Sequence, residues 1–122
     1  MEELCRDTGL SSRNVGELER YGLVTADTSG RVPTFGYDAL VVARAAAALR
    51  AQGVEARHLR MYKVAAEREA GYYEQLLMPV LKGRGTRAKR EAAETLDALL
   101  AHGDEIRGAL LRQAVRAHVA GA

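Results

Sequence analysis

Residues 8–24 constrain the fold more than any other stretch of this 122-residue chain. Their sequence, TGLSSRNVGELERYGLV, offers a pair of serines that can cap a helix and places Gly22 where a left-handed residue commonly ends one. Val15 and Leu18 lie three residues apart and therefore share one helical face. The stretch predicts a short helix over residues 12–21.

A second short helix is predicted just before it. Residues 2–7 place Leu4 and Cys5 where a helix can bury them, and Gly9 supplies the sharp turn between the two helices. Two short helices joined by a glycine turn form a helix-turn-helix. Because the chain has a single cysteine, Cys5 cannot form an internal disulfide, and we interpret it as a small core residue.

The sequence resembles the N-terminal winged helix-turn-helix of the MerR transcription regulators, whose usual pattern is TGVSxRTLRYYExxGL. The resemblance rests on TGLSSR at residues 8–13 and LERYGLV at residues 18–24. It continues through a polar loop at residues 25–36, in the place of the family's wing, then YDAL at residues 37–40 and GVEA at residues 53–56. It implies a winged helix-turn-helix over about the first half of the chain, and a homodimer joined by a long helix that follows it.

The second half of the chain is similar to FtsR-type actinobacterial regulators of cell-division genes. The similarity lies in RHLRMY at residues 57–62 and EQLLMP at residues 74–79. It implies that this chain is the C-terminal half of a longer protein, in which a separate N-terminal winged domain binds DNA.

The groups through which the MerR family contacts DNA are missing here. The resemblance places the family's recognition-helix arginine on Gly16, the neighbouring aromatic residue on Glu17 and the wing arginine on Pro33. Residues 1–54 carry six arginines and seven acidic residues, a net charge of −1, and a carboxylate that faces a phosphate is repelled. We therefore expect a helix-turn-helix that keeps its fold and has lost direct DNA readout.

Direct DNA binding by this chain is the alternative. Five side chains are candidates to face a duplex: Ser11, Ser12, Arg13, Arg20 and Arg31. Hydroxyl and guanidinium groups of this kind commonly hold phosphates, but none of them is an obvious reader of base edges.

The remaining segments predict a small wing and long helices. Turn-forming residues at 25–31 precede a strand-like run at 31–35, in which Pro33 indicates an edge strand. Residues 37–52 form an apolar core helix that Gly53 ends. The next helix opens at Glu55.

The apolar stripe of that helix, which includes Tyr62 and Tyr73 as core residues, should bend or stop near Met78, because Pro79 follows. After a basic linker, in which Thr86 can cap, residues 87–119 form one helix or a pair broken at Gly103. Unbroken, this helix is about 50 Å long and needs a partner chain to cover its apolar face. The candidate dimer interface consists of Leu96, Leu99, Leu100, Ile106, Leu110, Leu111 and Val115.

A ligand sensor is the third class of function. Cations, a thioether and aromatic rings gather around one helix and offer a possible effector pocket formed by Arg57, Arg60, Met61, Tyr62 and Tyr73. The sequence shows no histidine or cysteine spacing typical of a metal site, no phosphate-binding loop and no nucleophile with a base. We expect a non-enzyme without a metal or cofactor.

Composition agrees with a helical protein, since alanine, leucine and arginine are abundant and tryptophan is absent. No apolar run reaches the length of a membrane span, so we expect a cytoplasmic protein without membrane contact. The predicted fold is all-α, a MerR-like winged helix-turn-helix followed by long helices. We divide it into the winged domain at 1–54, a connecting helix at 55–82 and a dimerisation segment at 83–122.

Overall fold

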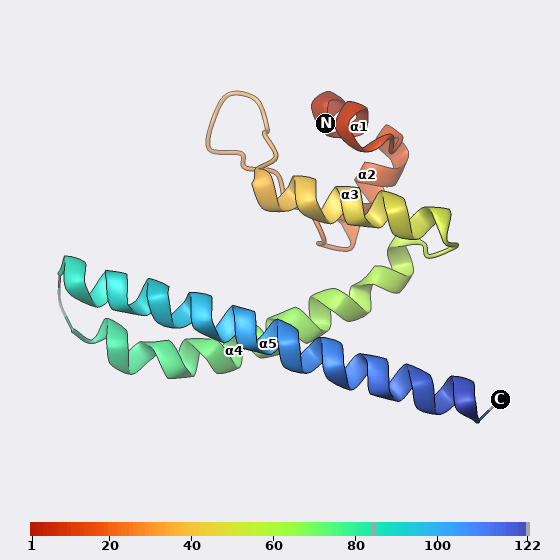
Figure 1. Cartoon of the computed structure of the whole chain (residues 1–122). Coiled ribbons are helices and arrows are strands. Elements are labelled where there is room, and N and C mark those ends of the chain that lie inside the picture. The colour runs from red at the N-terminus through yellow and green to blue at the C-terminus, as the bar shows by residue number, and fades with distance from the viewer. Residues whose placement is uncertain (84, 122) are drawn as a thin grey trace. The chain divides into compact units, whose positions relative to one another are not determined.

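The computed structural model describes residues 1–83 and 85–121 and has an all-α fold, which confirms the predicted fold class (Figure 1). The elements in chain order are α1 (Glu2–Thr8), α2 (Ser12–Arg20), α3 (Tyr37–Ala51), the 3-10 helix η1 (Ala56–Leu59), α4 (Arg60–Leu81) and α5 (Thr86–Ala120). They divide into two compact units, Met1–Glu67 and Arg68–Ala122. Within the described residues, no helix combines the length and apolar character that crossing a membrane requires.

The two short helices predicted at the start of the chain both form. Gly9 follows α1 with a φ of 77°, a left-handed conformation, and its N–H donates to the Cys5 carbonyl oxygen at 2.8 Å. Ser11 precedes α2, and its hydroxyl oxygen accepts a hydrogen bond from the Asn14 backbone N–H at 3.1 Å. Gly9 therefore sets the turn after α1, and the Ser11 cap sets the start of α2.

The core of the first unit lies where α1, α2, α3 and η1 meet. Val15 and Leu18 of α2 are its largest fully buried side chains. α3 adds small buried side chains at helical spacing, Ala39, Ala43 and Ala46, and its backbone approaches α1 most closely. The buried core comprises Leu4, Leu10, Val15, Leu18, Val24, Ala39, Ala43, Ala46, Ala56 and Leu59.

The strand predicted at residues 31–35 is wrong. Asp27 and Thr34 form an isolated antiparallel bridge, with N···O distances of 2.7 and 3.0 Å. Pairing does not extend towards the loop tip, because the Ser29 N–H donates to the Asp27 carboxylate at 2.9 Å instead of a cross-strand carbonyl. It does not extend the other way, since the Gly36 carbonyl oxygen accepts from Leu40 N–H in α3. The segment is a loop pinned by one bridge.

α4 continues past the point where proline is predicted to end or bend it. Pro79 lies inside the last turn, and the helix ends at Leu81, three residues beyond Met78. Only one intrahelical hydrogen bond is lost at this place, because the Pro79 nitrogen has no hydrogen. The Lys82 N–H still donates to the Met78 carbonyl oxygen at 3.1 Å. The prediction that Tyr62 is a core residue is wrong, since this residue is 51% exposed.

α5 is one unbroken helix of 35 residues, about 52 Å long at 1.5 Å per residue. Gly103 does not interrupt it. Thr86 is its first residue rather than its cap, and Gly85 holds the cap position without a side-chain hydrogen bond. In the second unit α5 runs back along α4 (Figure 1). Among the described residues of this unit only Ala88 and Ala92 are buried.

Candidate functional site

The face of α2 that points away from the core carries the residues predicted to meet DNA. The Ser11 hydroxyl is engaged in capping, while Ser12 and Arg20 are exposed on the helix. The Arg13 side chain is 89% exposed, and its Nε lies 3.9 Å from a Glu17 carboxylate oxygen. Arg31 is exposed in the loop. Phosphate binding by any of these groups stays a prediction.

The three positions that the MerR resemblance aligns with DNA-contacting residues lie on α2 and in the loop that follows it. Gly16 is half-buried on α2, with no heavy atom within 4 Å of where a Cβ would be, so the helix has room for a larger residue here. Glu17 is half-buried and forms an ion pair with Arg13 one turn earlier. Pro33 is exposed in the loop. Glu17 therefore partly neutralises the positive charge of Arg13.

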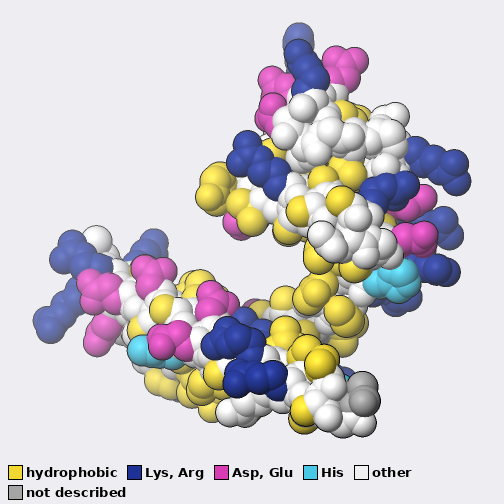
Figure 2. Space-filling model, turned by 45° about the vertical axis from the view of Figure 1, so that its right-hand side comes forward, with side chains coloured by type: hydrophobic (Ala, Val, Ile, Leu, Met, Phe, Trp, Pro, Cys, Tyr) yellow, Lys and Arg dark blue, Asp and Glu magenta, His cyan; other side chains and the backbone are white. Residues whose placement is uncertain are grey.

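The candidate dimer residues on α5 divide into two groups. Leu96 and Leu99 are half-buried and belong to the stretch of α5 that packs along α4. The others are exposed to between 47% and 63%, and they are Leu100, Ile106, Leu110, Leu111 and Val115. Val119, which the sequence reasoning did not include, is 69% exposed four residues beyond Val115. Figure 2 shows hydrophobic side chains gathered over the part of the molecule that α4 and α5 form.

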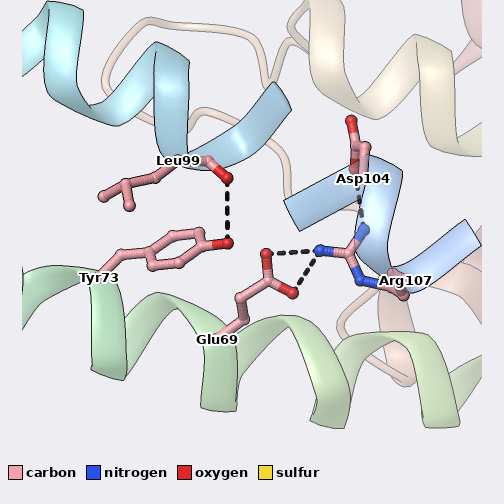
Figure 3. A network of polar contacts seen from close by, with 5 residues as sticks. All are labelled: Glu69, Tyr73, Leu99, Asp104 and Arg107. Atoms are coloured by element: carbon pink, nitrogen blue, oxygen red, sulfur yellow. Dashed lines mark hydrogen bonds and ion pairs between the residues drawn. The ribbon is translucent and has the colours of Figure 1, made fainter. Parts of the chain in front are cut away.

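A polar network ties α5 to α4 (Figure 3). The Arg107 guanidinium donates to both carboxylate oxygens of Glu69, with 2.5 Å to Oε2, and to Asp104 Oδ1 at 2.8 Å. The Tyr73 hydroxyl has a single hydrogen and two acceptors in reach, the Leu99 carbonyl oxygen at 3.2 Å and the Glu69 carboxylate. Asp104 thus pairs with Arg107 within the unbroken helix.

The same network shifts the protonation of its members. The Tyr73 hydroxyl and then the Arg107 guanidinium hold the pKa of Glu69 below its ordinary value, because both stabilise the carboxylate. The neighbouring Glu69 carboxylate raises the pKa of the Tyr73 hydroxyl. Asp104 and Glu69 raise the pKa of Arg107. The shifts favour the charged forms of Glu69 and Arg107, which the ion pair requires, and the neutral hydroxyl of Tyr73.

The five residues predicted to form an effector pocket are spread over both units. Arg57 pairs with Glu55 at 3.1 Å, and the Arg60 guanidinium lies 6.0 Å from the centre of the Tyr21 ring. Met61 and Tyr62 are 60% and 51% exposed. Tyr73 lies in the second unit, in the network with Glu69. An effector pocket formed by these five residues stays a prediction.

Sequence reasoning missed a groove in the first unit. This α1 groove has a volume of about 830 Å³ and lies between α1 and the loop that leads into α3. Apolar side chains from distant parts of the sequence line it, among them Leu4, Val32, Phe35 and Leu40, and none of the five effector candidates does. The exposed Val32 and Tyr37, at 70% and 78%, are the signals in the structure that mark it.

Residues 1–119 match the protein family described as the Rv1828-like, C-terminal domain. The chain belongs to this family. Two curated relatives are the HTH-type transcriptional regulators Rv1828 of Mycobacterium tuberculosis and Mb1859 of Mycobacterium bovis, each 28% identical to the chain over 115 residues. These residues make up 94% of this chain and 45% of each relative, so the chain spans less than half the length of the curated relatives.

The Rv1828-like C-terminal domain includes both surfaces described above. Its match begins at α1 and ends at residue 119, one residue before the end of α5. The exposed face of α2 and the exposed side of α5 are therefore parts of one family domain.

Proposed function

We propose that this chain is the dimerisation and regulatory domain of a MerR-family transcription regulator, whose helix-turn-helix has lost direct DNA readout. The observation that carries the proposal is the exposed apolar side of α5. Ile106 and Leu110 are 63% and 59% exposed, and Leu111 and Val115 are 59% and 52% exposed. Each pair is four residues apart, so each forms a continuous strip along the helix.

A second copy is the simplest cover for this surface. Leaving large apolar side chains in water is unfavourable, and burying one fully is worth roughly 1.5–3 kcal/mol. Contiguous exposed apolar surface on a helix marks an interaction site. A two-fold symmetric pairing of α5 with α5 buries these residues in both copies.

The DNA-binding function is proposed to lie elsewhere in a longer regulator. Both relatives are named as HTH-type transcriptional regulators, and the matched part is 45% of their length. The first unit carries nine Lys and Arg residues against nine Asp and Glu residues, which gives no excess positive charge for phosphates. The assignment to FtsR-type regulators of cell division rests on the sequence resemblance and belongs to the same proposal.

Sedimentation equilibrium of the purified chain tests the dimer. We expect a mass of two chains at micromolar concentration, and a single chain for Ile106→Glu and Leu110→Glu, because a buried carboxylate without a partner opposes association. Val41→Glu is the matched control, since Val41 is also an exposed aliphatic residue, at 46%, but lies on α3. Circular dichroism checks that each variant keeps its helices. A strict monomer of the unaltered chain at high micromolar concentration overturns the proposal.

A further inference from the structure

The α1 groove combines an apolar floor with an acidic rim. Its lining includes Glu2, Glu3, Asp7 and Glu19, against Arg6 as the single cationic side chain. A surface of this kind favours an occupant that is both apolar and basic, because opposite charges at a rim steer and orient a partner.

Such a segment exists in the chain itself. Residues 75–90, here called the hairpin tip, contain five Lys and Arg residues and no Asp or Glu. They also expose large apolar side chains where α4 ends: Leu76 is 40%, Met78 56% and Leu81 49% exposed. Lys82, Arg87, Lys89 and Arg90 are exposed around them. The tip therefore matches the groove in both apolar character and charge.

We propose that the α1 groove of one copy receives the hairpin tip of a second copy of this chain. The inference rests on the proposed dimer, which supplies the second copy. Met78 and Leu81 then cover the exposed Val32 and Tyr37 side chains, and the tip cations face Asp7 and Glu19. The contact is reciprocal in a symmetric pair, because each copy has one groove and one tip.

Charge reversal tests this contact without disturbing the helices that carry the charges. Asp7→Lys and Glu19→Lys reverse the groove, and both positions lie in the last turn of a helix, where a cation is favourable. Arg87→Glu and Lys89→Glu reverse the tip in the first turn of α5, where an anion is favourable. Dissociation constants are measured by sedimentation equilibrium at low ionic strength.

Each reversed chain alone is expected to associate more weakly by about tenfold or more, because like charges then face one another. An equimolar mixture of groove-reversed and tip-reversed chains is expected to regain the original affinity, since both contacts of the mixed pair again join opposite charges. Arg112→Glu with Arg116→Glu is the control, and it should not restore association to the groove-reversed chain. Raising the salt concentration should shrink all these differences.

The outcomes separate this inference from the dimer on which it rests. If the unaltered chain is a dimer whose affinity no reversal changes, the groove contact is wrong and the dimer stands. If the mixture fails but a chain with both reversals recovers, the tip belongs to the groove of its own chain, which overturns the second copy as occupant. A monomeric unaltered chain overturns both proposals.

Discussion

One hydroxyl group decides where α2 begins. The Ser11 Oγ accepts from the Asn14 N–H, whereas the Ser12 hydroxyl is the first side chain of the helix and is exposed. The two serines are neighbours with the same chemistry, but only one of them satisfies a backbone donor that the helix leaves free. This difference makes them a matched pair for experiment.

We expect Ser11→Ala to lower the free energy of unfolding by about 1 kcal/mol, because the Asn14 N–H then loses its acceptor. Ser12→Ala should change stability little, since alanine is a good helix former and no hydrogen bond of the Ser12 hydroxyl to a described residue is lost. Urea unfolding followed by circular dichroism measures both variants. Equal losses would contradict the assignment of Ser11 as the cap.

Two glycines inside helices predict opposite results for the same substitution. At Gly71 a Cβ would have no heavy atom within 4 Å, so we expect Gly71→Ala to stabilise the chain by about 0.5–1 kcal/mol. At Gly103 a Cβ would meet the Tyr73 hydroxyl, Glu69 Oε2 at 3.0 Å and Arg107 Nη2 at 3.2 Å. Gly103→Ala should therefore displace the polar network and lose that gain. Thermal unfolding compares them, and a melting temperature that rises equally in both argues against close packing at Gly103.

At the scale of elements, the pairing of α4 with α5 should depend on pH through Glu69. Its pKa in the folded chain is lowered from 4.5, so its contribution to stability is present above pH 4.5 and is lost as pH falls through the lowered value. We expect the unfolding free energy to fall on acidification by a smaller amount in Glu69→Gln than in the unaltered chain. Urea unfolding at a series of pH values measures the difference.

Glu67→Gln is the control for this experiment. Glu67 is an exposed glutamate two residues earlier on α4, and it forms no ion pair with a described residue. The unfolding free energy of Glu67→Gln should therefore depend on pH in nearly the same way as that of the unaltered chain. An identical acid dependence in all three proteins would show that the network does not stabilise the hairpin.

The helices are largely predictable from the sequence, and the loop and the groove are not. Local signals such as Ser11 and Gly9 act within one turn, so the sequence carries them directly. The strand predicted at residues 31–35 does not form, because the Ser29 N–H donates to the Asp27 carboxylate and not to a carbonyl oxygen across the loop. This local competition between two acceptors is not visible in the sequence pattern. The groove brings α1 and residues 26–40 together, a tertiary arrangement that no local pattern encodes.

The packing of the long helices is also only partly predictable from the sequence. The spacing of apolar residues predicts the apolar face of α5. Which of these residues pack on α4 and which remain exposed depends on the register at which the two helices lie side by side. Leu99 contributes the carbonyl oxygen that Tyr73 contacts, whereas Ile106, seven residues later, is 63% exposed. The polar network around Arg107 joins residues 38 positions apart, a distance along the chain that no helical spacing predicts.

At the scale of the whole molecule, the charge balance predicts weak binding to DNA. We expect the chain to bind a duplex from its own promoter region no more tightly than random sequence, with a dissociation constant of roughly 10⁻⁴–10⁻⁶ M at physiological salt. Glu17→Arg should strengthen this binding and steepen its salt dependence by about one unit of slope, because it adds a cation to the α2 face. Mobility shift at several salt concentrations measures both effects.

Glu94→Arg provides the comparison, since it makes the same change of charge at an exposed position on α5. A smaller effect there than at residue 17 would place the residual affinity on α2. Tight, sequence-specific binding by the unaltered chain would reverse the proposed loss of readout.

The small core of the second unit has a consequence for how the stability of the chain depends on protein concentration. Its only buried side chains among the described residues are two alanine methyl groups, Ala88 and Ala92, so we expect the proposed partner of α5 to supply part of its stability. For a proposed dimer, folding then follows mass action, and the melting temperature rises with protein concentration.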